Sequence, residues 1–175
     1  MTQLAGYRLR AAAVEDLAPL TAIYHEAVLH STATFDLHPA SRESWLRFHL
    51  NNSQYPLLVA VSPEGQVAGY GTLSPYREKE AYISTVELSI YVHTAHRRRG
   101  VATLLMQALL SACEAQPQTH LAVSVITAGN QPSERLHRRF GFTLSGTLPQ
   151  CGRKFGQWLG VETWWKVTEA EAETV

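Results

Sequence analysis

Residues 85–126 restrict the fold more than any other part of this sequence. Residues 85–93 alternate strictly between apolar and polar side chains, which predicts a β-strand with one face on the core. Residues 100–114 carry apolar side chains at the spacing of an amphipathic helix, and residues 121–126 form the continuous apolar run of a fully buried strand. A strand, a helix and a strand in this order predict a crossover unit with parallel strands.

The rest of the chain adds further strands and helices to this unit. A turn at residues 62–65 joins two of the strands and predicts a hairpin. From the same periodicities we expect strands over 7–10, 57–61, 66–73, 142–147 and 161–167, and helices over 14–29, 41–50 and 132–140. We therefore expect a single domain over residues 1–175, with a flexible tail at 168–175.

The composition argues against several classes of function. The chain carries 15 basic and 15 acidic side chains, so its net charge is zero, and we expect no nucleic acid or membrane as a partner. The sequence has no signal peptide and no apolar run approaching about 20 residues, which favours a soluble cytoplasmic protein. The two cysteines form no C-x-x-C pair and the eight histidines form no H-E-x-x-H motif, so we expect no metal.

Positive charge is concentrated where the alternating strand leads into the amphipathic helix. Arg97, Arg98 and Arg99 precede Gly100, and Ala102 follows within the first helical turn. Free backbone N–H groups and the helix dipole bind anions at such a point, and the two small residues let a phosphate approach the backbone. The spacing excludes a P-loop and a dinucleotide fingerprint. A polyphosphate site is one interpretation, and a solvated arginine cluster is the other.

Two motifs resemble those of the GNAT superfamily of acetyltransferases. Arg97, Gly100 and Ala102 form R-x-x-G-x-A, which resembles the pyrophosphate signature Q/R-x-x-G-x-G/A of that superfamily. Residues 130–142, NQPSERLHRRFGF, resemble the GNAT segment N-x-x-(S/A)-x-x-L-(Y/H)-x-x-x-G-F. The first motif also follows a strand and opens a helix, as it does in that superfamily.

Further motifs narrow the resemblance to one branch of the superfamily. Residues 85–93, TVELSIYVH, resemble a strand of the phosphinothricin and methionine sulfoximine acetyltransferases. The pair Tyr76 and Arg77 resembles their Trp-Arg pair, and residues 152–159, GRKFGQWL, resemble their G-x-K-F-G-x-W-L motif. The matches together extend over residues 7–167.

The resemblance implies an α+β protein with the GNAT fold and acetyl-CoA as co-substrate. Its central sheet is mixed and mostly antiparallel, with flanking helices and a splayed parallel strand pair that a bulge in the strand at 85–93 holds open. A homodimer is expected. The implied cofactor-binding residues are Ile90, Tyr91, Val92, Arg97, Arg98, Arg99, Gly100, Val101, Ala102, Thr103, Asn130 and Ser133.

Acetyl transfer to an amine needs a base, donors for the oxyanion and a proton for the departing thiolate. Glu87 is the candidate base, since burial on the polar face of a central strand would raise its pKa; a structural carboxylate paired with Arg77 or Lys79 is the alternative. A backbone N–H near residues 89–91 is the expected oxyanion donor. His137 stands where many GNAT enzymes carry a tyrosine, so it is either the general acid or only a partner of the thiol.

The acceptor implied by the resemblance is a small amino acid or an analogue such as phosphinothricin, methionine sulfoximine or methionine sulfone. Arg77 is suited to clamp a carboxylate through a bidentate pair, and an exposed loop arginine is the alternative. Phe35 and Tyr82 are expected to line the part of the pocket that holds the side chain of the acceptor. The expected acceptor-binding residues are Phe35, Tyr76, Arg77, Tyr82, Glu87, Leu88 and Ser89.

Other functions stay open at this point. A GNAT enzyme can acetylate a different primary amine, such as a protein N-terminus, a polyamine or an aminoglycoside, and a related module can bind CoA without catalysis. Three positions depart from the family pattern, because Phe35, Leu88 and Gly160 stand where relatives carry Trp, His and Asp. We expect the first two to reshape the acceptor pocket and Gly160 to affect how the last loop is fixed.

Overall fold

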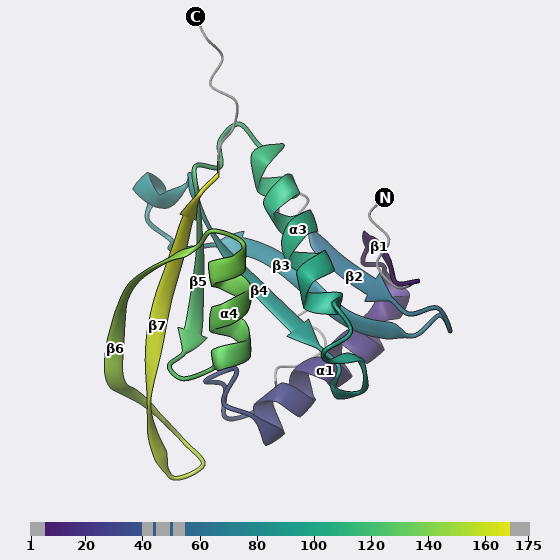
Figure 1. The fold of residues 1–175 in the computed structure, drawn as a ribbon, viewed down its shortest axis with the longest axis horizontal. Helices are drawn as coiled ribbons and strands as arrows, with labels where there is room; N and C mark the ends of the chain where they lie inside the picture. Colours follow the sequence, from purple (N-terminus) through teal and green to yellow (C-terminus); the bar gives the residue numbers. More distant parts are fainter. Residues whose placement is uncertain (1–5, 40–43, 45–49, 51–54, 169–175) are drawn as a thin grey trace, which may run out of the picture.

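The computed structural model describes residues 6–39, 44, 50 and 55–168. Helices cover both faces of one sheet, with α3 and α4 on one face and α1 on the other (Figure 1). The strands are ordered β1-β2-β3-β4-β5-β7-β6 across the sheet. Their bounds are β1 Arg8–Ala11, β2 Leu57–Val61, β3 Val67–Pro75, β4 Thr85–Val92, β5 Leu121–Thr127, β6 Thr143–Lys154 and β7 Gln157–Val167, and the helices are α1 Leu17–His30, α3 Val101–Glu114 and α4 Gln131–Arg139.

The expected elements agree with these bounds to within three residues, except for the last two strands. The helix expected over 41–50 falls outside the described residues, apart from positions 44 and 50. Thr168 was expected to begin a flexible tail, but it is buried, and its N–H and Oγ1 donate to His120 O and Thr119 O at 2.9 and 3.0 Å. Residues 169–175 of the expected tail lie outside the described part of the chain.

Strand β4 determines the geometry at the centre of the sheet. It pairs with β3 in one continuous antiparallel register from Val86 to Val92. It pairs with β5 in parallel only over Thr85–Glu87, after which the two strands separate. The mixed sheet with a splayed parallel pair is therefore confirmed. The prediction of a bulge in β4 is wrong, because the register between β3 and β4 has no shift. Where β5 separates from β4, it stays paired with β7.

The alternation along β4 directs its side chains to opposite layers. Val86 and Leu88 are buried on the α3 side, in a cluster that includes Leu109. Tyr91 lies on the other face, where its ring meets the Tyr24 ring of α1 edge to face at a centroid distance of 5.3 Å. The two faces predicted from the sequence are thus confirmed.

The last two strands form a hairpin much longer than the sequence pattern predicts. They continue to Lys154 and Gln157, and the two residues between them, Phe155 and Gly156, have φ of 50° and 77°. Positive φ at both central positions is the requirement of a type I′ turn, whose twist suits a two-residue hairpin. Figure 1 shows this hairpin extending below α4 and beyond the rest of the sheet.

Gly160 lies within β7, where it packs against the bulged part of β6. A Cβ at Gly160 would lie 2.9 Å from Leu148 O and 3.2 Å from the Cα of Pro149. The β6–β7 register shifts between Leu148 and Gly152, so the bulged part of β6 presses against the Gly160 backbone. An aspartate at position 160 would collide with this bulge, and the glycine is the residue that admits it.

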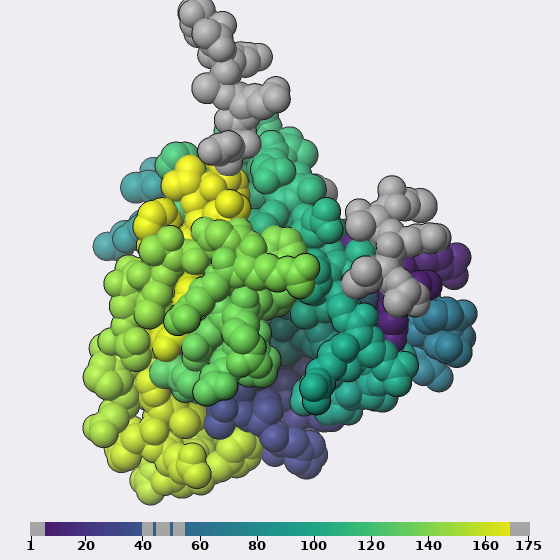
Figure 2. Space-filling model, viewed as in Figure 1, coloured from purple at the N-terminus to yellow at the C-terminus, as the bar shows by residue number. Residues whose placement is uncertain are grey.

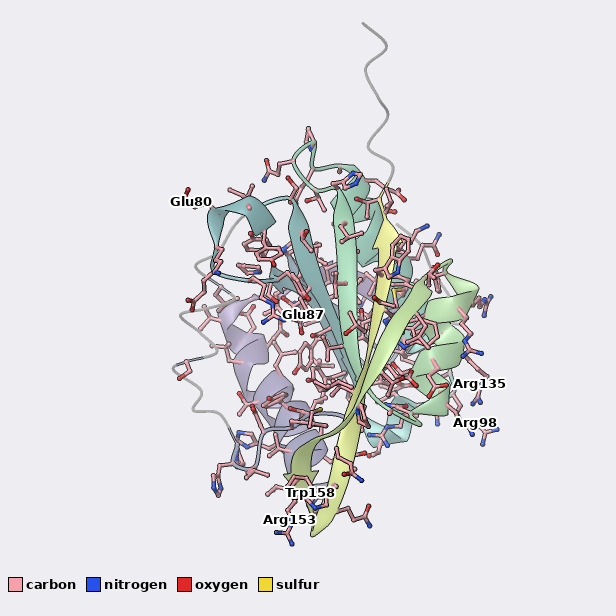
Figure 3. The ribbon with its side chains drawn as sticks, turned by 90° about the vertical axis from the view of Figure 1, so that its left-hand side faces the viewer. Glu80, Glu87, Arg98, Arg135, Arg153 and Trp158 are labelled. Carbon is pink, nitrogen blue, oxygen red and sulfur yellow. The ribbon has the colours of Figure 1, made fainter. Side chains whose placement is uncertain are left out.

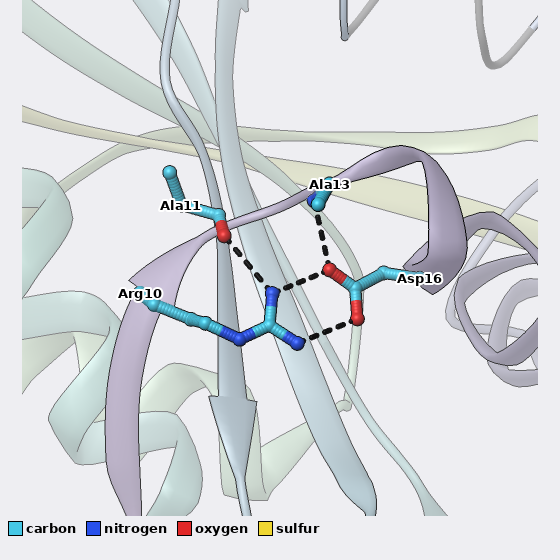
Figure 4. Close-up of polar contacts among 4 residues, drawn as sticks. All are labelled: Arg10, Ala11, Ala13 and Asp16. Atoms are coloured by element: carbon cyan, nitrogen blue, oxygen red, sulfur yellow. Dashed lines mark hydrogen bonds and ion pairs between the residues drawn. The ribbon is translucent and has the colours of Figure 1, made fainter.

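An ion pair fastens the first strand to the first helix (Figure 4). Asp16 ends the 3₁₀ turn that precedes α1, and its buried carboxylate accepts bonds of 2.5 and 2.8 Å from the two terminal nitrogens of Arg10. The same carboxylate accepts the backbone N–H of Ala13 at 2.8 Å. The Arg10 hydrogen bonds hold the pKa of Asp16 below its ordinary value. This pair holds α1 against the edge of the sheet.

Candidate active site

A fork opens between β4 and β5 on the side of α3 and α4. Its closed end is marked by Ser124, whose Oγ donates a 3.1 Å hydrogen bond to Leu88 O just beyond the last paired residues. Past this point, the edge of β4 that faces away from β3 has no strand partner among the described residues. Figure 2 shows the surface hollowed between α4 and the segment that leads into α3. An extended ligand with amide groups can bind along such an edge.

The loop that leads into α3 has the backbone of an anion site. Arg98 and Gly100 have φ of 61° and 83°, and Gly100 is the N-cap residue of α3. Alternating left-handed residues direct successive N–H groups into one concavity, and the first N–H groups of a helix have no helical acceptor. Thr103 lies in this first turn, while the buried Val101 offers only its backbone. Arg97, Arg98 and Arg99 are exposed on this loop, and Arg97 Nε donates a 3.3 Å hydrogen bond to Val92 O.

Two residues that the sequence did not reveal hold this loop in place. His96, directly before Arg97, is buried, and its Nδ1 lies 2.9 Å from the hydroxyl of Tyr7, which packs edge to face against it. Gly69 of β3 lies beneath the start of α3, where a Cβ would be 2.7 Å from Tyr91 O and 3.2 Å from Val101 Cγ1. Both contacts join residues far apart in sequence, so no local pattern could have indicated them.

Helix α4 borders the other side of the fork. The side chain of Asn130 is the N-cap, since its Oδ1 accepts the N–H of Ser133 at 3.4 Å. The half-buried Ser133 follows in the first turn. On β4, by contrast, the side chains of Ile90 and Val92 pack beneath α3, so only their backbone is available to a ligand in the fork.

His137 of α4 is not placed as a general acid. It is 5% exposed, packs edge to face on Phe142 at 4.9 Å, and its Nδ1–H donates to Ser133 O at 2.8 Å. Because a carbonyl oxygen can only accept, Nδ1 carries the proton of the neutral ring and Nε2 carries the lone pair. Burial lowers the pKa of His137 below its ordinary value, so the ring is neutral at physiological pH. It therefore has no proton to give from Nε2.

Glu87 lies on the α1 face of β4, half-buried at the centre of the sheet (Figure 3). Burial raises the pKa of its carboxyl, and the guanidinium of Arg77 acts in the opposite direction. Arg77 follows β3, whose Ser74 pairs with Glu87 across the ladder. A carboxylate with a raised pKa, within electrostatic reach of a guanidinium, is suited to accept a proton from an amine whose own carboxylate pairs with the arginine.

The exposed Arg77 packs against one of two neighbouring tyrosine rings. Its guanidinium carbon lies 5.0 Å from the ring centroid of Tyr76, which in turn meets the Tyr82 ring edge to face at 5.7 Å. The structure thus brings Tyr76, Arg77 and Tyr82 together at the end of β4 that carries Glu87. Ser89 and Tyr91 continue the same strand face towards α1.

Two expected acceptor residues lie apart from the group formed by Tyr76, Arg77 and Tyr82. Leu88 is 3% exposed and belongs to the core beneath α3, on the opposite face of β4 from Glu87, so its side chain cannot line the same pocket. This corrects its assignment. Phe35 lies in the loop that follows α1, and its ring contacts Gly152 of the C-terminal hairpin.

The described residues contain no group of three or more His, Cys, Asp or Glu side chains arranged to hold a metal ion. Within the same part of the chain, no helix combines the length and the apolar character needed to cross a membrane.

Comparison with known proteins agrees with this architecture. The sequence profile of the Acetyltransferase (GNAT) family matches residues 20–142. The chain is 41% identical over 154 residues to an L-methionine sulfoximine/L-methionine sulfone acetyltransferase from Pseudomonas aeruginosa, covering 86% of this chain and 88% of the relative. It is 40% identical to a phosphinothricin N-acetyltransferase from Streptomyces coelicolor, covering 92% and 96%.

Solved structures give the same result. A phosphinothricin acetyltransferase from Sinorhizobium meliloti, in complex with acetyl-CoA, superposes with a TM-score of 0.90 at 34% identity and covers 97% of this chain and 92% of its own. An acetyltransferase from Salmonella typhimurium with its cofactor acetyl-CoA superposes with a TM-score of 0.88 at 32% identity, covering 95% and 96%. The chain therefore belongs to the GNAT family and is an acetyl-CoA-dependent N-acetyltransferase.

Proposed function

We propose that this enzyme transfers the acetyl group of acetyl-CoA to the α-amino group of a small amino acid or analogue, such as methionine sulfoximine, methionine sulfone or phosphinothricin. The observation that carries the proposal is the half-buried Glu87, whose pKa is raised by burial and lowered by the electrostatic influence of the Arg77 guanidinium. An α-amino acid presents an amine and a carboxylate two bonds apart on one carbon, which fits this pair of groups. The activities named for the relatives support the same acceptor class.

The co-substrate fits the other face of the sheet. The pyrophosphate is assigned to Arg97–Thr103, where the loop backbone is arranged for an anion. The pantetheine arm is assigned to the fork, along the backbone of residues 90–92 and beside Asn130 and Ser133. Figure 3 shows Glu87 on the side of α1, and Arg98 on the side of α4. The thioester must therefore reach the acceptor through the fork.

In this arrangement, deprotonation of the amine and stabilisation of the oxyanion are each assigned to a group of the protein. Glu87 takes a proton from the ammonium of the acceptor, directly or through water, and the free amine attacks the thioester carbonyl. A backbone N–H of β4 near Ser89 stabilises the oxyanion. The C–N bond forms, the attacking nitrogen loses its second proton to water, the C–S bond breaks, and the CoA thiolate takes up a proton from that water. His137, neutral and buried, supports α4 in this proposal and does not donate that proton.

The homodimer and the cytoplasmic location also belong to this proposal. The hairpin presents Leu148, Phe155 and Trp158 at 61, 57 and 62% exposure, and β6 is an edge strand. A second copy of the chain would cover such an apolar edge. Trp158→Asp should then convert a dimer into a monomer in analytical ultracentrifugation, and a wild-type monomer would refute the assignment. The thiols of Cys113 and Cys151 are both free, which suits a reducing compartment.

Matched acceptors test the proposed substrate class. Methionine sulfone and its carboxamide carry the same amine and side chain, and only the first has a carboxylate for Arg77. The kcat/KM for the sulfone should greatly exceed that for the carboxamide. A higher rate with a polyamine, an aminoglycoside or a peptide N-terminus would overturn the acceptor assignment. Acetyl-CoA binding without turnover on any amine would identify a non-catalytic module.

A further inference from the structure

The loop that carries Phe35 is held by side chains from distant parts of the chain. We refer to residues 31–36, which follow α1, as the acceptor loop. Thr127, at the end of β5, donates its hydroxyl to Thr32 O. Lys154, at the end of β6, donates its ammonium to Thr34 O at 2.8 Å. Since side chains 95 and 120 residues away bind two carbonyls of one short loop, the position of this loop depends on the C-terminal half.

The burial of Lys154 is unusual for a lysine next to a hairpin turn. It is only 5% exposed, and burial lowers the pKa of its ammonium. Its Nζ lies 5.2 Å from the centroid of the Phe155 ring, and Asp36 is the carboxylate that acts on it electrostatically. Removing an ammonium from water costs free energy unless it makes a strong hydrogen bond. The bond to Thr34 O meets that need and directs the lysine to the acceptor loop.

Gly152 makes a second contact with the same loop. A Cβ built at Gly152 would lie 2.5 Å from Cδ2 of Phe35, and Cε2 of that ring is closer still. Non-bonded carbon atoms do not approach to this distance. The Phe35 ring therefore occupies the space that any other residue at position 152 would need.

The acceptor loop also connects to the face of β4 that carries Glu87. Tyr24 donates its hydroxyl to the Asp36 carboxylate and lies 3.2 Å from Thr34 Oγ1. Its ring meets that of Tyr91, four residues beyond Glu87 on the same face of β4. The loop thus lies at the end of the face where the acceptor is proposed to bind.

We propose that Lys154 and Gly152 are positioning residues that fix Phe35 as the wall of the acceptor pocket, so that the C-terminal hairpin determines which side chains the enzyme accepts. This inference rests on the proposed function and assigns a role to the GRKFGQWL motif at residues 152–159. Neither residue touches the reacting atoms. Both act through the acceptor loop.

The first experiment compares Lys154→Met with Arg153→Met. Methionine retains most of the lysine's packing but loses the donor to Thr34 O. Arg153 is the matched control, because it is the neighbouring cation but is exposed, with its guanidinium over the Trp158 ring. Lys154→Met should raise the KM for methionine sulfoximine by about fivefold or more and leave the KM for acetyl-CoA unchanged. It should also speed amide hydrogen exchange in residues 31–36, whereas Arg153→Met should do neither.

The second experiment is a double-mutant cycle between Gly152 and Phe35. Gly152→Ala should displace the ring and change the kcat/KM ratio between methionine sulfoximine and the shorter acceptor alanine. In a Phe35→Ala background the ring is absent, so the same Gly152→Ala change should leave that ratio unaltered. The two substitutions are then coupled, as expected of residues in contact. This cycle keeps the inference testable even if Lys154→Met fails to fold.

The outcomes separate this inference from the proposed function. If the wild-type enzyme acetylates neither acceptor, the proposed function has failed. If the wild-type enzyme is active but Lys154→Met leaves hydrogen exchange in the acceptor loop unchanged, Lys154 does not hold the loop. Faster exchange with an unchanged acceptor KM would show that the loop is not a wall of the pocket. Additive effects in the Gly152 and Phe35 cycle would overturn the inference as well.

Discussion

Replacing Glu87 with glutamine removes the proposed base while preserving the shape of the side chain. General-base catalysis contributes about 10²–10⁴-fold, so kcat should fall by that factor, equivalent to about 2.7–5.5 kcal/mol in activation free energy. Burial makes this carboxylate a stronger base than an exposed one, so a loss below about 10²-fold is not expected. The KM for acetyl-CoA should not change, because Arg98, in the loop that leads into α3, lies on the α4 side of the sheet and Glu87 on the α1 side.

The pH profile gives a stricter form of the same prediction. Only the ionised carboxylate accepts a proton, so kcat/KM of the wild type should rise with pH through the raised pKa of Glu87, and Glu87→Gln should lack this limb. The guanidinium of Arg77 lowers this pKa, so Arg77→Ala should move the limb to higher pH. The measurement is kcat/KM against pH with two acceptors whose amines differ in pKa, because the amine titrates too.

Stability offers an independent check on the same residue. A carboxyl whose pKa is raised on folding binds its proton more tightly in the folded state, so stability falls as pH rises from the ordinary value of 4.5 through the folded pKa. Glu87→Gln should therefore have the higher Tm at pH 7, and the difference should shrink below pH 4.5. Near-wild-type kcat with an unchanged pH limb would refute the reasoning and make Glu87 a structural residue.

Three further substitutions test other parts of the account. Arg77→Ala should raise the KM for carboxylate acceptors severalfold and leave that for acetyl-CoA unchanged; an equal loss for the carboxamide would contradict the clamp. Gly100→Val should strain the φ of 83° by about 1–2 kcal/mol and strongly raise the KM for acetyl-CoA, so a folded variant with normal affinity would exclude the anion site. Asp16→Ala should lower the free energy of unfolding at pH 7 by about 2 kcal/mol, since one partner of its ion pair is nearly half exposed. The lowered pKa of Asp16 makes this contribution present above pH 3.8 and lost as pH falls through the folded pKa, so urea titrations at pH 7 and pH 3 should give a smaller difference at pH 3.

The sequence predicted those parts of the fold in which one residue pattern determines one structure. Strict alternation placed Glu87 on the face opposite Val86 and Leu88, and the structure keeps that division. The apolar spacing of residues 100–114 predicted α3 and therefore the position of the arginine-rich loop before it. These features are local, so periodicity alone locates them.

The hairpin was missed because its residues resemble those of a loop. Proline and glycine usually indicate turns. In this hairpin Pro149 lies in a bulge, Gly152 makes a close contact with Phe35, and Gly156 belongs to a type I′ turn. Local propensity cannot distinguish these uses, because each depends on which strand or ring lies opposite.

The burial of individual histidines could not be predicted either. His137 lies at a position that suits a proton donor in the family motif. Its packing against Phe142 keeps the ring neutral, and its hydrogen bond to Ser133 O places the proton on Nδ1, so Nε2 can only accept a hydrogen bond. His96 has no motif of its own, and its role follows from Tyr7, 89 residues away. Such roles are set by tertiary contacts alone.

The central claim is that this chain moves an acetyl group from acetyl-CoA to the α-amine of an amino-acid analogue. The most direct measurement incubates the enzyme with acetyl-CoA and methionine sulfoximine, quantifies the released CoA thiol and identifies the product by mass spectrometry and NMR. We expect one α-N-acetyl product for each thiol released. Thiol release without acetylated amine, or no release from an enzyme that binds acetyl-CoA, would contradict it.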